Sequence, residues 1–114
     1  LRRAESYSKA GADLILIHSK ADTPKEIFSF SKKFSKSKYY KPLVAVPSTY
    51  SKVTEKELIK NGFKVVIYAN HLLRAAYPAM ENVALKVLKN SRSYESEKDI
   101  ISIKKILNII PKIE

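Results

Sequence analysis

The side chains best able to do chemistry follow short apolar runs of the chain. His18, Ser19 and Lys20 come directly after the first run, and Asn70 and His71 come after the third. An imidazole N–H can donate a hydrogen bond to an anionic oxygen, and does so more strongly when it is protonated. Ser19 could add a hydroxyl donor, and Lys20 could add positive potential. His18 could equally cap a strand end by bonding backbone groups, and the residue types alone leave both roles open.

Asn70 and His71 begin the longest predicted helix. Free backbone N–H groups and the positive end of the helix dipole favour an anion or a carboxylate there. Asparagine is also among the best N-cap residues, so we expect Asn70 to be a cap. For His71, both anion binding and a structural role stay open. Tyr50 and Tyr68, which also lie near strand ends, could be mouth residues or could pack at the rim, and we expect packing.

Three continuous apolar runs predict the strands that carry these residues. They span residues 13–17, 43–46 and 65–68, and none of them alternates with polar residues. Such runs are typical of strands buried on both faces of a parallel sheet. In an α/β fold, ligands bind beyond the carboxyl ends of parallel strands, which is where His18 stands.

Helix signals lie between the strands. Thr23 and Glu26 have the spacing of a capping box and predict a helix over residues 24–35. Thr54 and Glu57 repeat this spacing before a short helix. Glycines that tolerate positive φ close two helices: Gly11 follows the one predicted over residues 2–9, and Gly62 follows the short one.

The C-terminal part is predicted to be helical. An apolar stripe over residues 73–88 indicates a long helix, in which Pro78 marks either a kink or a late start near Tyr77. Residues 96–99 resemble a cap, and a last amphipathic helix should end before Pro111. We therefore expect three βα units in residues 1–90 and a terminal helical segment in residues 91–114. This order of elements predicts an α/β fold, as a small open sheet or as a slice of a TIM-type (β/α) barrel.

Composition bounds the possible functions. The chain has 114 residues, of which 45% are hydrophobic, enough for the core of a small domain. The absence of cysteine excludes disulfides, thiolate zinc sites and a cysteine nucleophile. The apolar runs fall far short of the roughly 20 residues of a membrane span, so we expect no membrane partner. The lack of cysteine fits a cytoplasmic location, which we therefore expect. The start at Leu1, without an initiator methionine, is typical of a segment of a longer protein.

A formal charge of +11 raises the possibility of a polyanion partner. The charges are mostly scattered lysines, with one concentration that we call the lysine cluster: Lys32, Lys33, Lys36, Lys38 and Lys41. A solvated helix end explains this cluster without a ligand, and no base-reading motif accompanies it. We expect no nucleic-acid partner. A basic module that binds RNA or an acidic partner is the alternative of a different class.

Residues 15–20, 43–50 and 66–71 form three motifs, and in this order they resemble motifs of the phosphoenolpyruvate mutases and phosphonopyruvate hydrolases of the isocitrate lyase superfamily. Residues 15–20 read ILIHSK and resemble the region of the sixth strand of the mutases. Residues 43–50 read LVAVPSTY and resemble the seventh strand, and residues 66–71 read VIYANH and resemble the eighth. Each motif is short, but three in order at this spacing make a specific signal. The resemblance implies that the chain is the C-terminal part, about strands six to eight, of a TIM-type barrel with terminal helices.

The resemblance also implies an activity and its residues. These mutases are isomerases of phosphonate biosynthesis that interconvert phosphoenolpyruvate and phosphonopyruvate, forming a carbon–phosphorus bond. His18 would be the catalytic residue that contacts the phosphoryl group, Ser19 would be a second substrate-binding residue, and Lys20, Asn70 and His71 would lie at the mouth. Magnesium would serve the complete enzyme, with its aspartate ligands upstream of Leu1 and no metal ligand in this chain. The partners would be a small phosphorylated or phosphonate substrate and further copies of the enzyme in a homo-oligomer.

Two departures leave the reaction open. Mutases commonly have tryptophan where this chain has Tyr68 and threonine where it has Ser48, whereas phosphonopyruvate hydrolases often carry a tyrosine at the first position. A hydrolase, and a carbon–carbon lyase of the isocitrate lyase type, are therefore the same-class alternatives. We expect the chain alone to be inactive.

Overall fold

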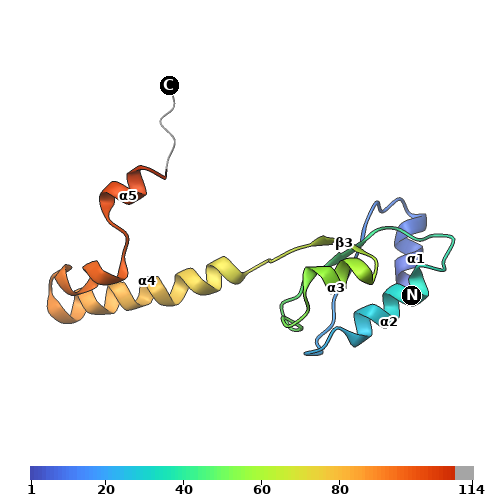
Figure 1. The fold of residues 1–114 in the computed structure, drawn as a ribbon, viewed down its shortest axis with the longest axis horizontal. Coiled ribbons are helices and arrows are strands. Elements are labelled where there is room, and N and C mark those ends of the chain that lie inside the picture. Colours follow the sequence, from blue (N-terminus) through green and yellow to red (C-terminus); the bar gives the residue numbers. More distant parts are fainter. Residues whose placement is uncertain (110–114) are drawn as a thin grey trace, which may run out of the picture. The chain divides into compact units, whose positions relative to one another are not determined.

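The computed structural model describes residues 1–109, which belong to two compact units, Leu1–Ala69 and Asn70–Glu114. The first unit alternates helices and strands, which confirms the predicted α/β class. The second unit is helical (Figure 1). The elements of the first unit are α1 (Arg2–Lys9), β1 (Ile15–Ile17), α2 (Lys25–Phe34), β2 (Leu43–Ala45), α3 (Glu55–Lys60) and β3 (Phe63–Val66). Those of the second are α4 (His71–Asn90), the 3₁₀ helix η1 (Tyr94–Asp99) and α5 (Ile103–Leu107).

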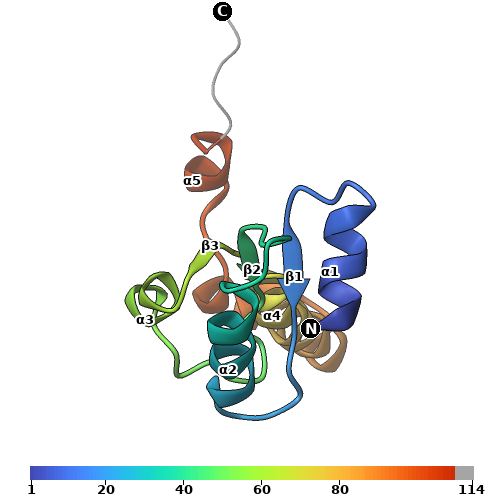
Figure 2. The ribbon, with the colours of Figure 1, turned by 90° about the vertical axis from the view of Figure 1, so that its right-hand side faces the viewer.

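The strands form one parallel sheet in the order β1-β2-β3 (Figure 2). The register pairs Leu16 with Val44 and Val44 with Val65. Strands β1 and β2 are shorter than the predicted apolar runs, and β3 has the predicted length but begins at Phe63, two residues earlier than predicted. Gly62, at φ +88°, reverses the chain after α3, so the strand can start at once. Because all three strands are parallel, their carboxyl ends lie along one edge of the sheet.

Helices cover one face of this sheet. Ile15, Leu43 and Phe63 stand in register and are buried in a core together with Phe34 of α2 and Leu58 of α3. Alternation along a strand turns the next residue to the opposite face.

On that opposite face the side chains are more open to solvent. Leu16 and Val44 directly follow Ile15 and Leu43, and a register shift between Leu43 and Val44 pairs Val44 with Val65. Leu16 is 54% exposed and Val65 is 38% exposed, while Val44 of the central strand is buried. The prediction that the strands are buried on both faces is therefore met for β2, whose three residues are all buried, and is wrong for β1 and β3, which expose Leu16 and Val65.

The two predicted capping boxes have different outcomes. At α3 the box is confirmed, because the Thr54 N–H donates to the Glu57 carboxylate at 2.8 Å and the Glu57 N–H donates to the Thr54 hydroxyl at 3.3 Å. These hydrogen bonds from the Thr54 backbone and side chain hold the pKa of Glu57 below its ordinary value. At α2 the box is wrong. The N-cap residue is Pro24 without a side-chain bond, and the Glu26 carboxylate is engaged by Ser19 instead.

The C-terminal helices differ from the prediction in two places. Helix α4 runs from His71 through Pro78, so the late start is wrong, because a missing proline N–H removes one helix bond and leaves the others. The single terminal helix with a cap at residues 96–99 is also wrong. Those residues lie in η1, and α5 begins only after Ser102, whose hydroxyl accepts from the Lys105 N–H at 3.3 Å. The predicted end before Pro111 lies outside the described residues.

Within residues 1–109, none of the helices combines the length and the apolar character needed to cross a bilayer.

Candidate active site at the strand ends

His18 stands one residue beyond the carboxyl end of β1, with its side chain exposed. The imidazole lies beside the ring of Tyr50, with ring centroids 6.3 Å apart and planes inclined at 42°. Tyr50 follows the end of β2 and is fully buried, which confirms that it packs. Neighbouring parallel strands therefore bring the predicted phosphoryl-binding histidine and a rigid aromatic side chain together at one edge of the sheet.

Ser19 is only 5% exposed, and its polar atoms bond to the protein. Its hydroxyl donates to the Glu26 carboxylate and accepts from the Ala21 N–H at 3.0 Å. Its backbone carbonyl accepts from the Thr49 hydroxyl at 2.7 Å. These three hydrogen bonds give Ser19 a structural role in the loop after β1. Its contact with a substrate stays a prediction. The adjacent Lys20 is exposed.

Glu26 and Thr49 are residues of this site that sequence reasoning missed. The Thr23–Glu26 spacing predicts a capping box, and a glutamate that holds a neighbouring loop produces the same spacing. Thr49 lies 30 residues from the carbonyl that it binds, so no local pattern could have shown the contact.

Asn70 and His71 belong to the second unit. Asn70 occupies the N-cap position of α4, where its carbonyl accepts from the Arg74 N–H at 3.0 Å, but its side chain makes no capping bond. His71 is the first residue of α4 and is half-buried. The structure thus groups His18 with Thr49 and Tyr50 in the first unit, and it describes Asn70 and His71 separately in the second.

Tyr68, the last predicted rim residue, is exposed, so the prediction that it packs is wrong. Its hydroxyl donates to the Glu55 carboxylate at 2.9 Å. This hydrogen bond raises the pKa of Tyr68.

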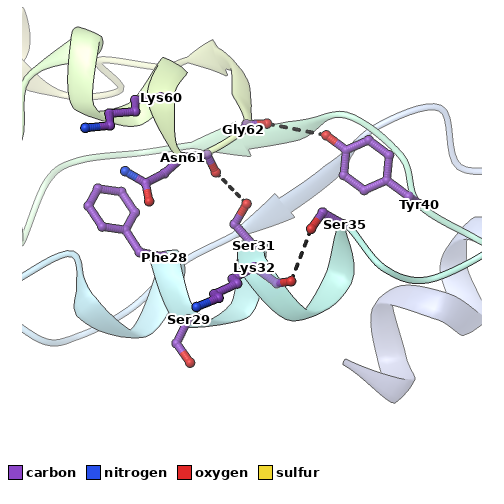
Figure 3. Close-up of a pocket in the computed structure, with 9 residues that line it drawn as sticks. All are labelled: Phe28, Ser29, Ser31, Lys32, Ser35, Tyr40, Lys60, Asn61 and Gly62. Atoms are coloured by element: carbon purple, nitrogen blue, oxygen red, sulfur yellow. Dashed lines mark hydrogen bonds between the residues drawn. The ribbon is translucent and has the colours of Figure 1, made fainter.

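A pocket of about 560 Å³ lies between α2 and α3, at the end of the sheet where β3 begins (Figure 3). Ser31 donates to the Asn61 carbonyl at 2.5 Å, and Tyr40 donates to the Gly62 carbonyl at 3.4 Å. The hydroxyl groups of the pocket are therefore largely used within the protein. Gly62 directly precedes β3, whereas His18 follows the end of β1, so this pocket and His18 lie at opposite ends of parallel strands.

The described residues do not fit a magnesium site. Between residues 1 and 109, no three His, Asp or Glu side chains come together in a group able to hold a metal ion. Magnesium is held in proteins by carboxylate oxygens with substrate oxygens and waters. What this edge offers is an exposed imidazole that can donate to an anionic oxygen.

Comparison with known proteins decides the family. The model of the phosphoenolpyruvate phosphomutase family matches residues 1–88, which include all three strands and His18. The chain belongs to the phosphoenolpyruvate mutase family. Among its curated relatives are the phosphonopyruvate hydrolase of Variovorax sp. (strain Pal2), 36% identical over 110 residues, and the phosphoenolpyruvate phosphomutase of Tetrahymena pyriformis, 35% identical over 109 residues. Each alignment covers 96% of this chain but only 37% and 35% of the relative.

Solved structures of the mutase family agree. The phosphoenolpyruvate phosphomutase of Streptomyces platensis subsp. rosaceus matches with a TM-score of 0.81 and 36% identity, over 96% of this chain and 37% of that protein. A phosphonopyruvate hydrolase in complex with oxalate and Mg²⁺ matches with a TM-score of 0.79 and 37% identity, over 95% of this chain and 38% of that protein. The prediction of a partial TIM-type barrel is confirmed, and the parallel sheet is a slice of it.

Proposed function

We propose that the complete protein is a phosphoenolpyruvate mutase, in which this chain supplies the phosphoryl-binding edge of the barrel. The observation that carries the proposal is the placement of His18. It is exposed beyond the end of β1 and lies beside a buried tyrosine, in a chain whose family match includes it. Active sites of TIM-type barrels lie at this edge.

The reaction moves a phosphoryl group between two atoms of one substrate. The phosphorus–oxygen bond of phosphoenolpyruvate breaks and a phosphorus–carbon bond forms, which leaves a ketone in phosphonopyruvate, so the atoms balance without a co-substrate. Negative charge is spread over the phosphoryl oxygens during the transfer, and stabilising it is the main catalytic task. The His18 imidazole serves this task by donating its N–H to one of these oxygens.

Magnesium and further copies of the chain complete the proposal. The hydrolase structure that contains Mg²⁺ and oxalate supports magnesium as the metal of the complete protein, held by residues other than those described here. Oligomerisation is supported by α4, none of whose residues is buried. Its exposed apolar side chains include Leu72, Leu73, Met80 and Leu88.

Phosphonopyruvate hydrolysis is the second candidate. It is favoured by Tyr68, which stands where mutases commonly have tryptophan, and by the 36% identity to a phosphonopyruvate hydrolase. Here water takes the phosphoryl group, the phosphorus–carbon bond breaks, and the carbon gains a proton, so that pyruvate and phosphate are formed. Phosphoryl binding by His18 is common to both reactions.

Phosphorus NMR of the full-length protein with phosphonopyruvate and Mg²⁺ tests both candidates. A mutase accumulates phosphoenolpyruvate, and a hydrolase accumulates inorganic phosphate. The matched control is the His18→Ala protein at the same concentration. If the wild-type protein consumes neither phosphonopyruvate nor phosphoenolpyruvate, both candidates are wrong.

A further inference from the structure

The loops that follow β1 and β2 are tied together around His18. The Thr49 hydroxyl donates to the backbone carbonyl of Ser19 at 2.7 Å, directly next to His18 in the chain. Ser19 is held in turn by its hydrogen bonds to Glu26 and to the Ala21 N–H. The backbone that carries the imidazole is thus fixed from two strands and from the first turn of α2.

The ring of Tyr50 restrains the imidazole itself. Tyr50 is fully buried and cannot swing away, and its ring centroid lies 6.3 Å from that of His18. An exposed histidine without such a neighbour would exchange among several rotamers. The buried phenol therefore limits the directions in which His18 can present its N–H.

The hydroxyl of Tyr50 contributes little to this contact. No described group accepts a hydrogen bond from it. Burial raises the pKa of Tyr50, and the nearby Val46 backbone offsets part of this shift, so the phenol is neutral at neutral pH. The ring, and not the hydroxyl, is the part that meets His18.

We propose that Thr49 and Tyr50 are positioning residues that set the orientation of the His18 imidazole toward the phosphoryl group. This inference rests on the function proposed above. Neither residue touches the reacting atoms, because the Thr49 hydroxyl is bonded to Ser19 and Tyr50 is buried. Their effect is on turnover, since a misplacement of about 1 Å in a catalytic group can cost about 100-fold in rate.

Two pairs of variants in the full-length protein separate positioning from mere stability. Thr49→Val keeps the shape and loses the donor, whereas Thr49→Ser keeps the donor. Tyr50→Leu loses the ring, whereas Tyr50→Phe keeps the ring and loses only the hydroxyl, from which no described group accepts a hydrogen bond. Thr49→Val and Tyr50→Leu should lower kcat by about 10- to 100-fold with a smaller change in KM. Thr49→Ser and Tyr50→Phe should stay close to wild type.

The second readout is the imidazole NMR signal of His18 in the absence of substrate, assigned by comparison with His18→Ala. Thr49→Val and Tyr50→Leu should shift or broaden this signal, and their conservative partners should leave it in place. Because no substrate is present, this readout tests the orientation of His18 even if phosphonopyruvate is not consumed. The proposal is overturned if Thr49→Val and Tyr50→Leu lower the melting temperature but leave the His18 signal and the kcat per folded molecule unchanged.

Discussion

If the proposed function holds, replacing His18 by alanine in the full-length protein should separate turnover from stability. The side chain is exposed, and exposed substitutions usually change the free energy of unfolding by no more than about 0.5 kcal/mol. The tilted contact with Tyr50, at 6.3 Å between ring centroids, lies at the far end of the range for aromatic pairs. It adds about 0.5 kcal/mol. The total loss of stability should therefore be about 1 kcal/mol or less.

The loss of turnover should be much larger. Removing one preorganised donor to developing negative charge lowers kcat by about 10²- to 10³-fold. At 1.36 kcal/mol per tenfold change, this corresponds to about 3–4 kcal/mol of transition-state stabilisation.

A core substitution provides the matched control. Phe34 is fully buried, and Phe34→Ala should lower the free energy of unfolding by about 3–5 kcal/mol. This loss is similar in size to that of His18→Ala, but it falls on stability and not on turnover. The assay is phosphorus NMR turnover per folded molecule, combined with urea unfolding followed by circular dichroism. Near wild-type turnover of His18→Ala, or activity that is lost only in proportion to the unfolded fraction, would show that His18 is structural.

Three further outcomes are expected. Replacing Lys32, Lys33, Lys36 and Lys38 by glutamine should leave kcat and KM nearly unchanged in steady-state assays, because α2 ends at the edge of the sheet opposite His18. A large loss of activity would mean that the lysine cluster guides a substrate or partner. Gly62→Ala should destabilise the protein by about 1–2 kcal/mol in urea unfolding, because φ is +88° and the new Cβ would lie 3.1 Å from the Ser31 hydroxyl. Gly11→Ala is the control, because φ is +103° there and no atom lies within 4 Å of the new Cβ, so only backbone strain should lower its stability. If Gly11→Ala loses as much stability as Gly62→Ala or more, the Ser31 contact has no role. The isolated chain should be inactive and should bind a hydrophobic dye, because Leu16 and Val65 leave one face of the sheet open; a cooperatively folding monomer without dye binding would contradict this.

Local patterns were enough to predict much of this protein. Continuous apolar runs predicted three strands, and the Thr54–Glu57 spacing predicted the capping box of α3. Gly11 and Gly62 were correctly placed at positive φ. These features depend on hydrogen bonds and sterics between residues a few positions apart, which sequence spacing describes directly. The position of His18 after an apolar run predicted, for the same reason, that it lies at a strand end.

Tertiary structure decided the surroundings of His18. The Thr23–Glu26 spacing equals that of the Thr54–Glu57 box, yet Glu26 accepts from Ser19, because the buried loop after β1 brings a hydroxyl donor to its carboxylate. Thr49 and Tyr50 reach Ser19 and His18 only because parallel pairing of β1 with β2 places the two carboxyl ends side by side. Contacts between residues about 30 positions apart depend on strand register, and register is set by burial of the whole core, which no local spacing encodes.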